Sequence, residues 1–284
     1  MKKVTFFALL CLIQVTAFSQ LVEAGLMGGA MFYKGDLTPG LYSPLHPAGG
    51  MLIRFNVHER VSLKGNVLIG SVSGADNVPE NQNNPDRLRR NLSFHSSIIE
   101  FAAEVELNLI KEFNSKGERR ICVPYVFAGL ETFHFNPKAD LTDSISGVTT
   151  TYELQPLGTE GQGLTKYPGL KRYNLTAFGF PMGLGVKVHM GKYWSLGAEM
   201  GMRKTLTDYL DDVSGFYVER DLISAQYGPV AGRLADRTYE VLPGVENPKG
   251  NIRGNPTNQD WYGFTGIWVS YTFYKKSKYR CSTF

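Results

Sequence analysis

Carboxylates alternate with apolar side chains over residues 99–109, which have the sequence IEFAAEVELNL. A β-strand turns successive side chains to opposite faces, so Glu100, Glu104 and Glu106 would share one face and the apolar residues the other. Carboxylates gathered in this way suit acid–base catalysis, cation binding or a structural ion network. The choice among these depends on which face of the strand meets water.

Charges of both signs recur on the matching face of other alternating segments. The acidic and basic sets nearly balance, and glycine is frequent on the same face, which suits the crowded interior of a narrow barrel. Buried charges must be paired, because an isolated ion in a medium of low dielectric constant is costly. We therefore expect a structural ion network inside a barrel, in preference to a catalytic or ion-conducting cluster, formed by Glu23, Arg54, Lys64, Glu100, Glu104, Glu106, Lys187, Glu199 and Arg203.

The elements that position these charges are period-two segments, and amphipathic helix patterns are almost absent. Short connections between the segments alternate strictly with long polar ones, which is the asymmetry of an outer-membrane barrel. The sequence therefore predicts an all-β fold, an eight-stranded antiparallel up-and-down transmembrane β-barrel with long extracellular loops and apolar residues facing lipid. The expected strands are 21–33, 48–57, 61–71, 94–110, 121–135, 173–190, 193–207 and 261–274; the facing of the fifth is left open because both of its faces are mixed.

Aromatic residues gather near the ends of the expected strands, where outer-membrane barrels carry two interfacial girdles. On this basis we expect Phe32, Tyr33, Phe133, Phe135, Tyr193, Trp194, Trp261, Tyr262, Phe273 and Tyr274 to mark the membrane interfaces.

The two ends of the chain have their own signatures. Residues 1–19 combine a basic start, a short apolar run and a small-x-small end, which is typical of a secretory signal peptide. The barrel would then span residues 20–274, and residues 275–284 would form a basic tail. By parity, both termini of the mature barrel lie in the periplasm. The net charge of +4 includes two lysines of the signal peptide, so the sequence gives no support for nucleic-acid binding.

Two cysteines, Cys122 and Cys281, remain after removal of the expected signal peptide, and both fall on the periplasmic side of the predicted barrel. In an oxidising compartment they would pair either with each other or with a partner protein. Both alternatives are open.

The sequence contains few other residue patterns that indicate a catalytic or binding site. No metal-ligand spacing, phosphate loop or nucleophile elbow is present, and we expect no cofactor and no enzymatic activity. His95 and Ser97 share a strand face in a pattern similar to that of a barrel-type lipid A deacylase, but two residues so spaced carry little specificity. We interpret them as ordinary polar residues near a strand end.

Two segments carry a specific family resemblance: 203–218, RKTLTDYLDDVSGFYV, and 253–273, RGNPTNQDWYGFTGIWVSYTF. GGAMFYKGDL (28–37) and PYVFAGLETFHFNP (124–137) agree with it. The mature chain resembles the PorG-type outer-membrane barrels of the type IX secretion system. The resemblance implies a structural or assembly component that anchors a periplasmic ring made of a PorK-type lipoprotein and its PorN-type partner. That apparatus serves protein transport and, in gliding bacteria, gliding motility. A generic outer-membrane barrel for adhesion or envelope integrity is the alternative.

The resemblance also marks motif positions near the predicted long-loop end. These are Arg203, Asp208, Tyr209, Asp211, Asp212, Arg253, Gly254, Asn255, Asp260 and Trp261. We expect Arg203 to hold Asp208, Asp211 or Asp212 by charge-assisted hydrogen bonds, with Asp260 as a second candidate. The motifs are interpreted as a folded cap over the barrel mouth, and binding of a surface partner is the competing interpretation.

Overall fold

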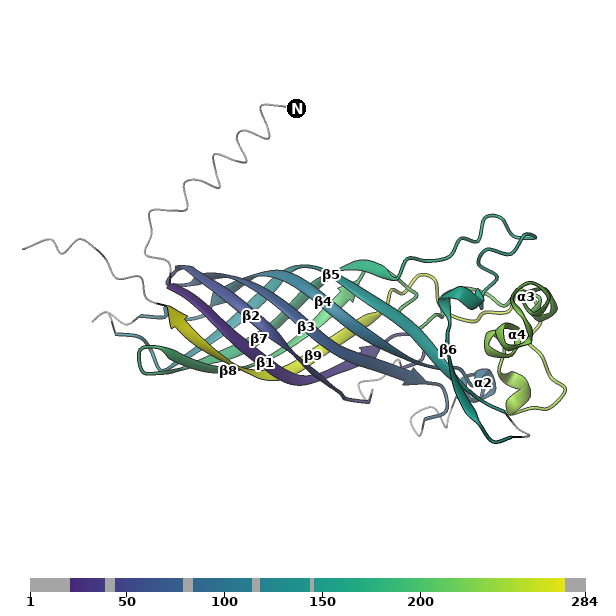
Figure 1. Ribbon diagram of the computed structural model, residues 1–284. Helices are drawn as coiled ribbons and strands as arrows, with labels where there is room; N and C mark the ends of the chain where they lie inside the picture. Colours follow the sequence, from purple (N-terminus) through teal and green to yellow (C-terminus); the bar gives the residue numbers. More distant parts are fainter. Residues whose placement is uncertain (1–20, 39–43, 79–83, 114–117, 144–145, 274–284) are drawn as a thin grey trace, which may run out of the picture.

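The computed structural model describes residues 21–38, 44–78, 84–113, 118–143 and 146–273. The expected signal peptide, Tyr274 and the basic tail with Cys281 lie outside the described residues. Within them the chain forms a closed barrel (Figure 1). Its strands are β1 (Leu21–Lys34), β2 (His46–His58), β3 (Val61–Ala75), β4 (Ser93–Asn108), β5 (Cys122–Thr142), β7 (Thr176–Met190), β8 (Trp194–Thr205) and β9 (Trp261–Phe273).

Each barrel strand pairs antiparallel with its neighbours along the chain, and β9 pairs with β1 to close the ring. Closure leaves no free sheet edge around the barrel, as a bilayer requires. The predicted eight-stranded up-and-down barrel is confirmed, and every expected strand overlaps an observed one. None of the helices in the described parts of the chain is long and apolar enough to cross a membrane.

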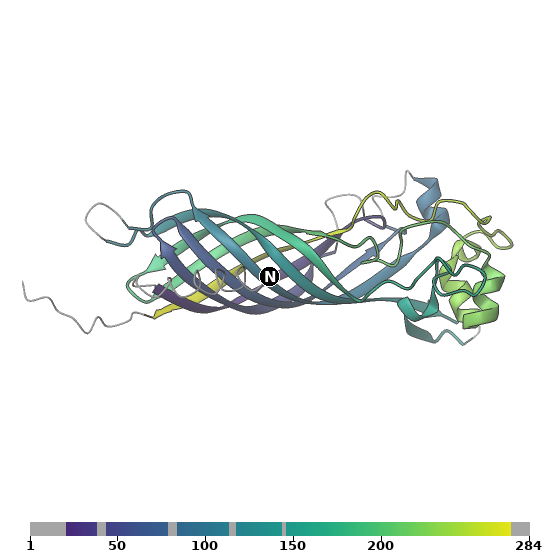
Figure 2. The ribbon, with the colours of Figure 1, turned by 90° about the horizontal axis from the view of Figure 1, so that it is seen from above.

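The barrel is strongly asymmetric along its axis. Short connections at residues 59–60 and 191–193 lie at one end, where β1 begins and β9 ends. The long connections lie at the other end and carry β6 and the helices of the described residues (Figures 1 and 2). The predicted alternation of short and long connections is therefore confirmed.

Burial alternates along the strands and shows which face of each strand points into the lumen and which points outward. In β4 the even-numbered residues from Phe94 to Asn108 are buried, whereas the odd-numbered residues from Ser97 to Leu107 are exposed. Phe101 is 54% exposed and Leu184 is 62% exposed, whereas Glu100 and Glu106 are fully buried. Apolar side chains thus cover the outer wall and charged ones fill the lumen. A wall of this kind is stable against lipid hydrocarbon and unfavourable in water.

Aromatic side chains explain why the facing of β5 is not evident from its sequence. Its lumen face carries Val123, Tyr125, Phe127, Phe133 and Phe135, all of which are buried. Aromatic residues thus occupy positions where other strands place polar ones, so both faces of the segment look mixed. The expected girdles need a corresponding correction: Tyr33, Phe133, Phe135 and Tyr262 point into the lumen, while Phe32, Tyr193, Trp194, Trp261 and Phe273 keep at least partly exposed side chains.

Glycines make room for these lumen rings. A β-carbon at Gly197 would lie 2.3 Å from the Trp268 ring, and one at Gly183 would lie 2.6 Å from the tip of Phe127. Neither ring position is compatible with a larger residue opposite. The glycine content of the lumen face therefore reflects packing of large side chains in a narrow tube.

The long connections contain structure that the period-two pattern does not predict. The sequence pattern predicts a loop from residue 136, whereas β5 continues to Thr142 and forms a hairpin with β6 (Thr149–Glu153) beyond the barrel rim. The helices are α2 (Pro85–Arg90), α3 (Arg220–Tyr227) and α4 (Pro229–Ala235), with 3₁₀ turns η3 (Gln155–Leu157) and η4 (Thr238–Glu240). Each is too short to give a recognisable helical periodicity, which is why the sequence pattern does not reveal these helices in the loops.

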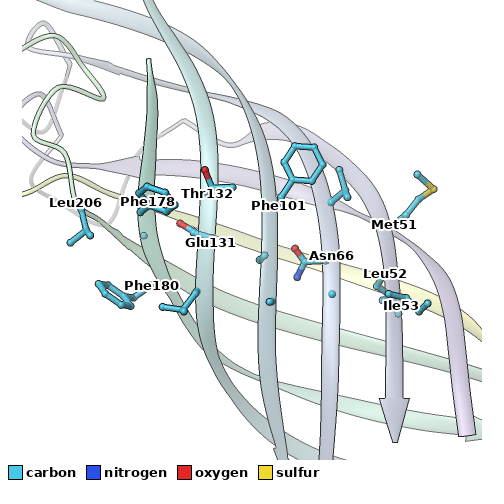
Figure 3. Close-up of a pocket in the computed structure, with 16 residues that line it drawn as sticks. Met51, Leu52, Ile53, Asn66, Phe101, Glu131, Thr132, Phe178, Phe180 and Leu206 are labelled. Atoms are coloured by element: carbon cyan, nitrogen blue, oxygen red, sulfur yellow. The ribbon is translucent and has the colours of Figure 1, made fainter. Parts of the chain in front are cut away.

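A shallow apolar hollow of about 800 Å³ crosses the outer wall from β2 to β7 (Figure 3). Gly65 and Ala103 face each other at its floor on neighbouring strands. Larger side chains, among them Phe101 and Phe178, stand around it. The hollow gives the wall a concave surface on which hydrocarbon chains can pack.

Because the apolar wall faces outward, a charge placed on it should destabilise the barrel more near the middle of the bilayer than near its edge. We expect Leu184→Arg, in the middle of β7, to lower the free energy of unfolding in lipid vesicles by about 2–4 kcal/mol. The same substitution at Leu206, just beyond the end of β8, is the matched control and should cost at most about 1 kcal/mol. Denaturant titration of both variants in vesicles measures the difference. Equal costs at the two sites would contradict the membrane placement of the barrel.

Candidate functional site: a filled lumen and a folded cap

The lumen holds a network of buried ion pairs, and the part nearest the short-turn end is centred on Arg54. Its guanidinium contacts Glu23 at 2.8 Å and Glu106 at 2.8 Å. Lys187 reaches the same Glu106 at 2.6 Å. The Arg54 guanidinium also lies 4.5 Å from the centre of the Trp268 ring, in cation–π geometry. Every one of these charges is therefore paired although it is removed from solvent.

Lys64 continues the network across the barrel. Its ammonium lies 2.8 Å from Glu104 on the adjacent strand and 2.9 Å from Glu199 on β8. Glu199 accepts a further hydrogen bond of 2.9 Å from Tyr125. The two contacts of Glu199 join strands that are not neighbours in the sheet, so the network braces the barrel through its centre.

Arg203 is the centre of the ion pairs nearest the long loops. It contacts Glu100 at 3.2 Å, and the Tyr262 hydroxyl lies 3.0 Å from Glu100 and 3.1 Å from Glu131. The expectation that Arg203 holds the loop aspartates is wrong. Its side chain belongs to the lumen face of β8 and is fully buried there, so it reaches β4 across the barrel instead of rising into the loops.

Arg253 occupies the position in the loops that was expected for Arg203. Its guanidinium contacts Glu160 at 3.0 Å, the backbone oxygen of Asp212 at 2.5 Å and the Asp212 carboxylate at 3.7 Å. Glu160 in turn accepts hydrogen bonds from the backbone amides of Ser214 and Gly215. Residues near 160, 212 and 253 are thus tied together in one buried cluster, which we call the cap cluster.

A second part of the cap sits directly over the barrel mouth. The Tyr33 hydroxyl, at the end of β1, lies 2.6 Å from Asp211 and 2.8 Å from Asp260. The other oxygens of the two carboxyl groups accept the backbone amides of Val213 and Leu210. One hydroxyl proton cannot serve two carboxylates, so one carboxyl group must itself be protonated. Burial raises the pKa values of Asp211 and Asp260 well above the usual range, and repulsion adds to it, by Asp36 for Asp211 and by Asp211 for Asp260.

Asp212 and Asp208 complete the acidic content of the cap. Asp212 accepts hydrogen bonds from Thr159 and, at 2.7 Å, from Tyr173. Burial raises the pKa of Asp212 to about 6 and that of Asp208 to about 7. Tyr173 stacks on Tyr209 with 4.6 Å between ring centres, so the cap joins hydrogen bonds to aromatic packing.

A family model described as "Domain of unknown function (DUF6089)" matches residues 2–151, more than half of the 284-residue chain. The chain belongs to the DUF6089 family. No curated protein matches the sequence of this DUF6089 member. Solved structures of small outer-membrane barrels do match its fold.

Three of these structures illustrate the likeness. Ail, the attachment invasion locus protein of Yersinia pestis, crystallised with the heparin analogue sucrose octasulfate, has 8% identity and a TM-score of 0.39, covering 90% of this chain and 100% of that one. Neisserial surface protein A has 10% identity and a TM-score of 0.39, with coverages of 90% and 98%. The N-terminal barrel domain of Pseudomonas aeruginosa OprF has 10% identity and a TM-score of 0.32, with coverages of 90% and 98%. At such identities the likeness concerns the fold alone.

The remaining motif positions of the DUF6089 chain take distinct places. Gly254 is buried against Asp36, which leaves no room for a β-carbon, and the backbone amide of Asn255 donates to the Asp36 carboxylate at 2.6 Å. Trp261 opens β9 and is half-buried.

Four further residues belong to the lumen network although the sequence pattern does not single them out. Glu131 lies on the aromatic lumen face of β5. Arg119 and Glu112, from the connection between β4 and β5, pair at 2.6 Å, and Arg119 also contacts Glu23. His189 lies 3.6 Å from Glu112. The KEFNSKGERR connection is itself charged, and the inward position of its Glu112 and Arg119 could not be inferred from strand periodicity.

The other candidates for chemistry stand apart. His95 and Ser97 lie on the outward-facing side of β4, and no hydrogen bond joins their side chains among the described contacts. Cys122 opens β5 as an exposed free thiol. No group of three or more His, Cys, Asp or Glu side chains arranged to hold a metal ion occurs in the described part of the chain.

Proposed function

We propose that this DUF6089 chain is a sealed outer-membrane barrel with a structural role and that it does not conduct solutes. The filled lumen carries the proposal. Its largest fully buried side chains include Trp268, Arg54, Arg203, Tyr125 and Lys64, which occupy the space that a channel would need. An eight-stranded barrel is just wide enough to be filled by side chains in this way.

The finer proposal is that the barrel anchors the periplasmic ring of a type IX secretion apparatus. Its support is the resemblance of segments 203–218 and 253–273 to PorG-type barrels. In space these segments contribute the end of β8, the whole of β9 and the cap residues Asp211, Asp212 and Arg253. A rigid barrel with a fixed cap suits a component that serves as an attachment point.

The orientation follows from the asymmetry of the barrel. Outer-membrane barrels place short turns in the periplasm and long loops outside the cell. We propose that residues 59–60 and 191–193 face the periplasm and would meet a PorK-type lipoprotein or its PorN-type partner. Cys122 lies at this end and is available there for a disulfide with a partner or with Cys281.

Deletion of the gene is expected to abolish secretion of proteins that carry C-terminal sorting domains. The physical reason is that the ring would lose its membrane anchor while the rest of the apparatus remains. Mass spectrometry of the culture medium measures the loss, and expression of the full chain from a second locus should restore secretion. Normal secretion with impaired attachment of the cells would instead favour the adhesion alternative and contradict the secretion role.

Site-specific cross-linking tests the proposed side of contact. A photoreactive residue in place of His58 or Lys192, at the short-turn end, should capture the ring lipoprotein. The same residue in place of Lys249, in the long loops, is the matched control and should not. Capture of the lipoprotein from position 249 alone would reverse the proposed orientation.

A further inference from the structure

The long-loop end contains a polar cavity of about 630 Å³ between α2 and the segment 247–255. Four arginines line it, three of them from α2, so guanidinium groups are concentrated around one space. We call this cavity the arginine pocket; its lining includes Arg87, Arg89, Arg90, Tyr217, Asn251 and Arg253. Cavities of this size hold small molecules in other proteins.

Two of the arginines form the frame of the pocket and are fully engaged. Arg90 makes a double contact with Asp76, at 2.6 and 2.8 Å, and donates to the backbone oxygens of Asp36 and Arg253. Arg253 is held in the cap cluster by Glu160. These two side chains fix the walls of the pocket relative to the barrel.

Three lining residues carry polar atoms that lack a partner. The Nη1 atom of Arg87, the Nε atom of Arg89 and the hydroxyl of Tyr217 are all buried and form no hydrogen bond within the described structure. Tyr217 as a whole is only 4% exposed. Buried donors without partners are costly, typically by about 1–3 kcal/mol each, so their occurrence around one cavity needs an explanation.

The acidic residues of the pocket do not supply these partners. Asp36 accepts the Asn255 amide, and Asp86 lies in the first turn of α2. Neither forms an ion pair with Arg87 or Arg89 among the described contacts. Burial and the neighbouring charge of Arg90 lower the pKa of Arg87, and the nearby charges of Asp76 and Asp36 do not offset them.

We propose that the arginine pocket binds the phosphate group of a phosphorylated sugar. Arginine forks match the geometry of a phosphate, and the donors that lack partners are the groups such an anion would satisfy. The pocket is too large for phosphate alone, and its amide and hydroxyl groups suit the hydroxyls of a sugar. The sugar phosphate comes either from solution or from the headgroup of a lipid in the same membrane. This proposal is independent of the secretion role.

The test is a binding titration with the full chain in lipid nanodiscs. The probes are glucose 1-phosphate, inorganic phosphate and glucose. We expect glucose 1-phosphate to bind and glucose not to bind. Arg87→Gln combined with Arg89→Gln should weaken binding at least tenfold, because charge-assisted hydrogen bonds are lost. Arg120→Gln is the matched control at the opposite end of the barrel and should leave affinity unchanged.

Tyr217→Phe keeps the test decisive if the double arginine variant does not fold. The hydroxyl has no partner in the described structure, so its removal should leave the fold intact while weakening glucose 1-phosphate binding about tenfold. Nanodiscs that contain lipid A, whose headgroup carries sugar phosphates, distinguish the source: competition identifies the membrane lipid, and its absence identifies the soluble sugar. Equal affinity of the wild type and the pocket variants, or equal binding of glucose, would overturn the proposal.

Discussion

Replacement of Arg54 by methionine is expected to destabilise the barrel by about 3–5 kcal/mol, the usual cost of removing one partner from a buried ion pair. The guanidinium is fully buried and contacts both Glu23 and Glu106. Methionine fills much of the same space but neutralises neither carboxylate. Lys187 and Arg119 still approach these glutamates, so the network is weakened at its centre without being dissolved.

Denaturant titration in lipid vesicles measures this loss. Ile53→Met, one residue away on the outer wall, introduces the same side chain outside the network and should cost less than about 1.5 kcal/mol. Adding Glu106→Gln to Arg54→Met removes one of the uncompensated charges and should recover part of the loss. If Arg54→Met were as stable as Ile53→Met, the lumen charges would not be the structural network we describe.

The cap is expected to loosen as the pH rises, because Tyr33, Asp211 and Asp260 share protons that only the folded state retains. A carboxyl group whose pKa is raised in the folded state stabilises that state fully below its unfolded pKa, near 4. This contribution to stability is lost as the pH rises through the pKa that the group has in the folded state. Burial also raises the pKa of Asp212 to about 6 and that of Asp208 to about 7. These two carboxyl groups likewise stabilise the folded cap at low pH, so the loss of stability extends through neutral pH.

The contacts of Tyr33 indicate which carboxyl group holds the proton. Nearby charges do not select one, because repulsion by Asp36 disfavours ionisation of Asp211 more than Arg90 favours it, and Asp208 and Asp211 disfavour ionisation of Asp260. The Tyr33 hydroxyl lies closer to Asp211 than to Asp260, so Asp211 is the better acceptor. We therefore assign the proton to Asp260 and the negative charge to Asp211.

Hydrogen exchange of segment 207–214, whose amides at Leu210 and Val213 bond to the pair, measures the opening of the cap. Tyr33→Phe should weaken protection by about 1–3 kcal/mol, since the two carboxyl groups lose their shared hydroxyl. Asp260→Asn, which supplies a permanent donor, should reduce the pH dependence. Asp221→Asn on exposed α3 is the matched control and should change nothing. Protection that increases with pH in the unaltered chain would contradict this assignment.

The sequence by itself determined the barrel. Successive side chains of a β-strand point to opposite faces of the sheet. The apolar outer face, the polar lumen face and the number of strands therefore follow from local patterns such as 99–109. The alternation of short and long connections likewise fixed which end carries the loops. These features depend only on neighbouring residues along the chain, which is why the eight strands and the facing of β2, β3, β4, β7 and β8 could be predicted. The facing of β5 and the inward position of Tyr33 and Tyr262 could not.

Only the tertiary structure decided which charges meet and how the loops fold. Arg203 pairs across the lumen with Glu100, 103 positions earlier in the chain, while Arg253 takes the loop position expected for it. The arginine pocket joins α2 to a segment more than 150 residues later. Such partners depend on the register and tilt of closed strands and on how long loops pack over the mouth. Periodicity specifies only the face of the strand on which a side chain lies. It does not specify how far along the barrel axis the side chain lies, which residue faces it across the lumen, or how the loops pack.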